Sequence, residues 1–141
     1  MQLYESVQPL KESEDTPAMI TSLKPNEIFV FGSNEGGKHA GGAAKIAMKW
    51  GAEWGNGVGI QGHTYAIPTL DEDFEMIDVR KIGDYVADFI EFARKHPKLH
   101  FWVTEIGTGI AGYTHAQIAP LFKKAINVPN ISLPLKFKEL I

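Results

Sequence analysis

The chain has 141 residues, of which 44% are hydrophobic, and it carries 14 Lys and Arg against 17 Asp and Glu for a formal net charge of −3. This length fits a single domain with enough apolar material for a packed core. The acidic balance argues against a protein that holds nucleic acid by neutralising phosphates, and the absence of cysteine excludes disulfides, thiolate metal sites and a cysteine nucleophile.

The first half of the chain predicts two strands and one helix. Residues 1–25 form an irregular lead-in broken by prolines, and the apolar run at 28–31 is typical of a strand buried on both faces. Residues 40–50 are small and then bulky, which predicts a helix that packs closely on a sheet. A turn-rich segment at 55–62 precedes β-branched and aromatic residues at 64–68, which predict a second strand that ends at its proline.

The second half continues the alternation of strands and helices. An aspartate cap and an apolar stripe predict a helix over 78–95, and residues 99–104 predict a third strand. A capping box opens a helix over 114–125, and residues 131–133 predict a last strand. We therefore expect one α/β domain over 1–141, a three-layer sandwich with a mixed, largely parallel sheet flanked by helices.

A first Gly-rich loop follows the strand at 28–31 and opens the next helix. Glycines let backbone N–H groups approach a ligand, and a helix start favours a phosphate, so this loop is a candidate phosphate site. The alternative is a turn that only lets the helix pack on the sheet. The ligand-binding candidates in this loop are Ser33, Asn34, Gly41, Gly42 and Ala43.

A second Gly-rich loop follows the strand at 99–104 in the same way. Loops that leave the carboxyl ends of parallel strands share one edge of an open sheet, so the two loops are expected to face one crevice and hold a diphosphate. We expect Asn34 and Tyr113 to line its rim. The candidates in this loop are Gly107, Thr108, Gly109, Ile110, Ala111, Gly112 and Tyr113.

Residues 107–113 resemble the loop of macro domains that wraps the diphosphate and distal ribose of ADP-ribose, and Asn34 before 41–44 is similar to the Asn and glycine run of that family. Across 27–135 the chain looks like a compact group of macro-like bacterial and phage proteins. The resemblance implies a macro domain-like fold and ADP-ribose as ligand. Ala111 stands where the family places a bulky aromatic, and no counterpart of its adenine-reading Asp precedes residue 28, so another nucleotide or a phosphosugar stays open as ligand.

Two residues are candidate acids or bases for catalysis. Glu105 follows a buried strand at the expected ligand edge, and His39 lies within the first loop. The competing roles are a salt bridge for Glu105 and an exposed loop position for His39. A nucleotide or phosphoester hydrolase that uses either residue, an ADP-ribosyl hydrolase, and a non-catalytic interaction protein with structural glycines all remain open.

The expected partner is a small nucleotide, ADP-ribose or a relative, with no cofactor. Neither a metal-binding spacing of histidines nor a covalent nucleophile beside a base is visible in the sequence. Nucleic acid and membranes are not expected partners, and the chain reads as cytoplasmic. The sequence gives no indication of oligomeric state.

Overall fold

The computed structural model describes residues 14–141, and the lead-in predicted for 1–25 can be compared only from residue 14 onward. Residues 14–26 contain no helix or strand, as expected. They run along the sheet edge, where Thr16 donates through its amide to Leu133 O (2.9 Å) and through its hydroxyl to Ser132 O (3.0 Å). The lead-in is thus fixed to the last strand.

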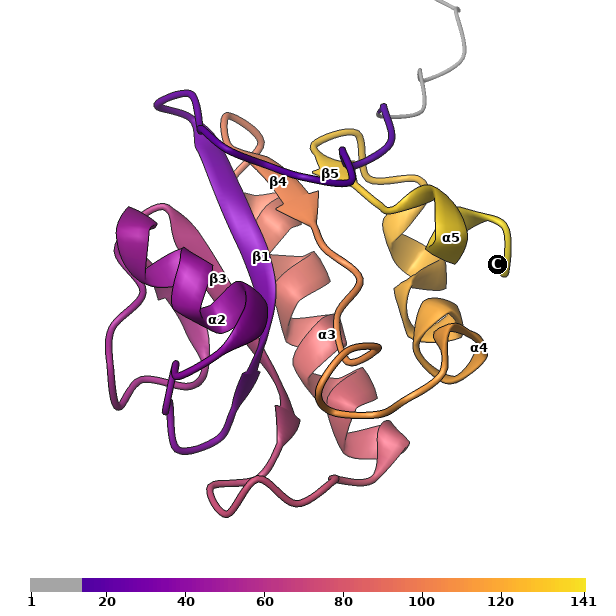
Figure 1. Cartoon of the computed structure of the whole chain (residues 1–141). Coiled ribbons are helices and arrows are strands. Elements are labelled where there is room, and N and C mark those ends of the chain that lie inside the picture. Colours follow the sequence, from indigo (N-terminus) through magenta and orange to yellow (C-terminus); the bar gives the residue numbers. More distant parts are fainter. Residues whose placement is uncertain (1–13) are drawn as a thin grey trace, which may run out of the picture.

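A five-stranded sheet in the order β2-β3-β1-β4-β5 forms the centre of the domain (Figure 1). β1 pairs in parallel with β3 and β4, and β4 pairs in parallel with β5, whereas β2 runs antiparallel to β3. The predicted mixed, largely parallel sheet is therefore confirmed. The strands are β1 (Glu27–Asn34), β2 (Gly59–Gln61), β3 (Thr64–Leu70), β4 (His100–Val103) and β5 (Ile131–Ser132).

Helices cover both faces of this sheet, consistent with a three-layer sandwich (Figure 1). One face carries α2 (Gly42–Ala47) and the 3-10 helix η1 (Met48–Trp50), with a small core that includes Phe29 and Phe31. The other face carries the larger core. Its helices are α3 (Val79–Lys95), α4 (His115–Ile118), the 3-10 helix η2 (Ala119–Ala125) and α5 (Leu135–Lys138).

The long helix and its cap agree with the sequence pattern. Asp78 accepts a hydrogen bond from the Arg80 amide at 2.8 Å, and α3 then continues for 17 residues to Lys95. The capping box at Thr114 is also present. The helix it opens is α-helical for only four residues and continues as 3-10 helix, with Pro120, which has no amide hydrogen, in the first turn of η2.

Two details differ from the predicted elements. β3 does not end at Pro68 but continues to Leu70. β2 pairs with β3 only from Thr64 to Ala66, so Pro68 has no partner strand on the β2 side, and its missing amide hydrogen breaks no hydrogen bond there. The short elements β2 and α5 were not predicted.

Candidate functional site

The two Gly-rich loops meet at one edge of the sheet, as predicted. The first loop (residues 35–41) leaves the carboxyl end of β1 and the second loop (residues 104–114) leaves the carboxyl end of its parallel neighbour β4. A cavity of about 270 Å³ lies between them, and we call it the loop pocket. The loop pocket is lined by Gly32, Ser33, Asn34, Lys38, Ala40, Gly41, Gly42, Ala43, Ala44, Thr69, Leu70, Phe74, Thr104, Glu105, Ile106, Gly107, Gly109, Ile110 and Ala111.

Both loops bring main-chain N–H groups to this pocket. α2 begins at Gly42 without a side-chain cap, so the amides of its first turn have no intrahelical acceptor. Within residues 14–141, the amides of Gly109, Ile110 and Ala111 donate to no protein acceptor either. The Ile110 Cδ1 atom would lie 3.6 Å from a methyl group placed on Gly41, so the two loops approach each other directly. The pocket is therefore bordered by free hydrogen-bond donors from two segments.

Other glycines nearby serve packing. A methyl group on Gly57 would lie 2.1 Å from Asn34 O, and one on Gly37 would lie 2.3 Å from Asn56 N. The first loop and the turn at residues 55–57 thus interlock through bare backbone. Ser33 lines the loop pocket, but its hydroxyl donates to Gly57 O at 2.5 Å and is occupied by this contact.

Asn34 shapes the first loop from within. Its buried side chain accepts from the Lys38 amide at 2.9 Å and donates to Lys38 O at 3.0 Å. This pair of hydrogen bonds closes the loop over residues 34–38. Asn34 also lines the loop pocket, as expected, although both functional atoms of its side chain are already engaged by the loop.

His39 lies away from the pocket. The imidazole is 2% exposed, its Nε2 is 3.0 Å from Asn56 O, and its ring meets Phe31 edge-on at a centroid distance of 5.3 Å. It is absent from the pocket lining. The interlocking of the first loop with residues 55–57 turns this side chain inward, so its predicted role as acid or base finds no support in this position.

Tyr113 was expected to line the rim of the loop pocket, and this expectation is corrected. It is buried beneath the second loop, which it supports by hydrogen bonds. Its buried hydroxyl lies 2.5 Å from Ile77 O and 3.0 Å from Thr69 O, and its amide donates to Gly107 O at 2.9 Å. Burial raises the pKa of the phenol, which stays protonated as a donor. Among the predicted ligand residues, Thr108 and Gly112 also lie outside the pocket lining. Thr108 Oγ1 donates to Glu105 O at 2.8 Å and the Gly112 amide donates to Gly109 O at 3.0 Å, so both brace the loop.

Glu105 lines the loop pocket and is paired with a histidine. Its Oε1 atom lies 2.6 Å from Nε2 of His115, the first residue of α4, and both side chains are partly exposed. The imidazole fixes the orientation of the carboxylate beside it, and the two groups can exchange a proton. This pairing was not predicted, because the two residues are separated by the whole second loop.

Lys38 and Phe74 also border the pocket. Lys38 Nζ donates to Glu72 O at 3.1 Å and lies 5.5 Å from the centroid of the Phe74 ring. Phe74 was not singled out from the sequence, since a lone aromatic in the acidic stretch 71–75 gives no periodic signal. The loop between β3 and α3 therefore joins the two Gly-rich loops at this edge.

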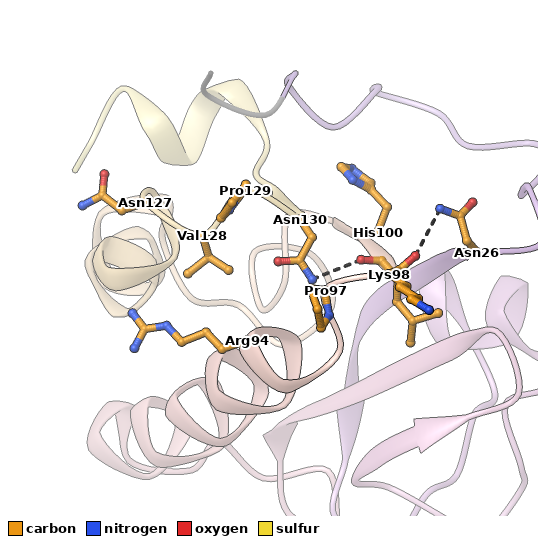
Figure 2. Close-up of a pocket in the computed structure, with 10 residues that line it drawn as sticks. Asn26, Arg94, Pro97, Lys98, His100, Asn127, Val128, Pro129 and Asn130 are labelled. Carbon is orange, nitrogen blue, oxygen red and sulfur yellow. Dashed lines mark hydrogen bonds between the residues drawn. The ribbon is translucent and has the colours of Figure 1, made fainter. Parts of the chain in front are cut away.

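A larger cavity of about 460 Å³ lies at the opposite, amino ends of the strands (Figure 2). Asn130 lies in its centre and donates through Nδ2 to Ala93 O, His96 O and Leu99 O at 2.9 to 3.1 Å. Asn26 donates to Lys98 O at 3.4 Å. These amide side chains are engaged in closing the end of α3 and the start of β4. In open α/β sheets ligands bind at the carboxyl ends of strands, so the loop pocket is the stronger candidate despite its smaller volume.

Over the described part of the chain, no helix is long and apolar enough to cross a membrane. The same residues contain no group of three or more His, Asp or Glu side chains that could hold a metal ion. Comparison of the chain with protein-family models, with curated proteins and with solved structures found no match.

Proposed function

We propose that this chain is a macro domain-like module that binds ADP-ribose or a related phosphate-containing nucleotide in the loop pocket. The observation that carries the proposal is the convergence of two Gly-rich loops on one cavity, each with main-chain amides facing no protein acceptor. Phosphate oxygens are strong acceptors, and clustered backbone N–H groups at a loop and helix start are a recurrent way to bind them.

The charges around the pocket favour recognition by amides over recognition by cations. Lys38 is the one Lys or Arg side chain among the residues given above as lining the pocket, and Glu105 supplies an opposite charge. Electrostatic attraction between charged groups is screened by salt, whereas short hydrogen bonds from neutral amides are affected less. Binding that rests on the two loops should therefore weaken only modestly as ionic strength rises.

The size of the pocket limits how much of the ligand it encloses. A volume of about 270 Å³ is slightly below the roughly 300–1,000 Å³ typical of small-molecule sites. A diphosphate with an adjoining sugar suits this space better than a complete dinucleotide. The rest of the ligand would lie at the mouth of the pocket, over the half-exposed and exposed side chains there.

Calorimetric titration with ADP-ribose, ADP and ribose 5-phosphate tests the proposal. We expect saturable binding of ADP-ribose, and stabilisation of the fold by about 2.7 kcal/mol at a ligand concentration 100 times the dissociation constant. Absence of both heat and thermal stabilisation with all three ligands at millimolar concentration would refute it.

A second candidate function is hydrolysis of an ADP-ribosyl group or a phosphoester, favoured by the Glu105–His115 pair at the pocket wall. In this reaction the Glu105 carboxylate takes a proton from a water molecule as the water oxygen bonds to the ribosyl carbon or the phosphorus. The bond from that atom to the leaving group breaks, the leaving group keeps the electron pair and takes a proton from solvent, and His115 holds the carboxylate in place. Release of free ADP-ribose from an ADP-ribosylated peptide, or of inorganic phosphate from a nucleotide, would be measured. Binding without turnover by the unaltered protein would leave the binding module as the function.

A further inference from the structure

Phe74 is an aromatic side chain at the mouth of the loop pocket that the core does not use. It lines the pocket and is 49% exposed. The other large apolar side chain in the lining that is similarly uncovered is Ile110, at 83% exposed. Both side chains therefore remain available to a ligand at the mouth of the pocket.

The backbone holds Phe74 in an unfavourable conformation. Its φ is 63°, the one positive φ of a residue other than glycine in the part of the chain that the structure describes. Such a conformation is uncommon for a bulky residue and tends to occur at functional sites. The ring is not buried in exchange for this conformation, which is held by the hydrogen bonds of its own turn.

The surrounding loop keeps Phe74 in place. The amides of Asp73 and Glu75 both donate to Asp71 Oδ1, at 2.8 and 2.9 Å, and the Phe74 amide donates to Asp71 O at 3.1 Å. Leu70 and Met76 form an antiparallel bridge at the base of the loop. The backbone position of Phe74 is therefore determined by the loop before any ligand arrives.

Lys38 connects this ring to the first Gly-rich loop. Its ammonium lies 5.5 Å from the ring centroid and also donates to Glu72 O, so the first loop directly contacts the loop that carries Phe74. The acidic side chains around Phe74, at residues 71–75, would repel a phosphate but not an uncharged ring. The two parts of the site thus differ in chemistry and lie side by side.

We propose that Phe74 is a stacking platform for the nucleobase of the ligand, with the phosphates held between the two Gly-rich loops. This inference rests on the proposed function and makes it more specific: the ligand is a nucleotide with a planar base, and a phosphosugar without a base binds more weakly. The small volume of the loop pocket agrees with a base that stacks outside it.

The experiment compares AMP with ribose 5-phosphate, which differ by the base alone, in the unaltered protein and in Phe74→Leu and Phe74→Tyr. Leu keeps an apolar side chain of similar reach without an aromatic face, and Tyr keeps the face. Stacking of one base on an aromatic side chain corresponds to roughly a 5- to 100-fold change in affinity. We expect Phe74→Leu to weaken AMP binding by such a factor and to leave ribose 5-phosphate binding unchanged. Phe74→Tyr should bind AMP as tightly as the unaltered protein does.

Met76→Leu serves as the matched control, because Met76 is an exposed apolar residue of the same loop that does not line the pocket. Equal affinity of the unaltered protein for AMP and ribose 5-phosphate would overturn the stacking platform and leave the phosphate site standing. So would a Phe74→Leu protein that melts normally and binds AMP as before. Failure of ADP-ribose, ADP, AMP and ribose 5-phosphate alike to bind the unaltered protein would overturn the proposed function, and the platform with it.

Discussion

Gly41 offers a direct test of the amide-lined pocket. Its φ of −156° and ψ of 167° are extended values that any residue adopts, so a side chain there brings no backbone strain. A methyl group at this position would meet only the Ile110 Cδ1 atom within 4 Å, at 3.6 Å. Gly41→Val therefore places a branched side chain beside the first amides of α2, and its Cβ atom has room among the described residues.

The expected effects on folding and on binding differ in size. Replacing glycine at a helix N-cap by an apolar residue costs about 1 kcal/mol of folding free energy. Loss of one hydrogen bond from an amide to a charged phosphate costs about 1.5–3 kcal/mol, which is roughly a 10- to 100-fold rise in the dissociation constant. Calorimetry with ADP-ribose measures the second quantity and urea denaturation the first.

Gly109→Val repeats the test on the second loop, because a methyl group on Gly109 would meet no atom of residues 14–141 within 4 Å. Both variants should fold and both should bind ADP-ribose more weakly. A normal dissociation constant for either variant would show that its loop does not contact the ligand. Reduced affinity in one variant alone would show that only one loop contacts the ligand, and would refute a diphosphate held between the two loops.

Three further predictions follow from the contacts at this edge of the sheet. Gly57→Ala should destabilise the fold by several kcal/mol in urea denaturation, since its methyl group would lie 2.1 Å from Asn34 O, and a melting profile like that of the unaltered protein would contradict the packing role. Glu105→Gln should lower any hydrolytic turnover by about 100-fold or more, as a lost general base does, while the dissociation constant for ADP-ribose changes little; unchanged turnover would remove the carboxylate from the chemistry. A hydrogen bond from Lys81, and next one from Tyr85, lower the pKa of Glu35 below its usual 4.5. The Glu35–Lys81 pair therefore stabilises the fold above pH 4.5 and loses this effect as the pH falls through the lowered pKa of Glu35. The destabilisation by Lys81→Met, measured by thermal melts, should therefore shrink from pH 7 to pH 3, and a constant difference would exclude the linkage.

The elements that the sequence predicts well are those with strong local signals. α3 combines an aspartate cap with a long apolar stripe, and Ile82, Val86 and Phe89 are fully buried along it. β2 has three residues, begins with a glycine and pairs only with β3, so nothing in its own sequence distinguishes it from a turn. Short elements of this kind are determined by tertiary pairing, which a single sequence does not reveal.

The roles of individual glycines in the candidate site also depend on tertiary contacts that the sequence does not reveal. Gly37 and Gly41 belong to one Gly-rich stretch, and their roles differ because the turn at residues 55–57 packs against the first of them. The same contact turns His39 inward to Asn56 O, a buried position that is neither of the two roles that the sequence left open. Local composition predicts that a Gly-rich loop exists, and long-range packing decides which of its atoms face a ligand.

The three loops at the pocket are each held in place by hydrogen bonds or ion pairs within the protein, and this affects how a ligand would bind. The first loop is closed by the Asn34 side chain and linked to α3 where Lys81 pairs with Glu35 at 2.7 Å. The Tyr113 hydroxyl connects the second loop to the main chain at Thr69 and Ile77, the two ends of the loop that carries Phe74. Because these braces are formed by the protein itself, the main chain of the loops is positioned before binding, and little backbone ordering entropy is lost when a ligand arrives. The phosphates would then be held mainly by preorganised main-chain donors, and Phe74 would add the contact to the base.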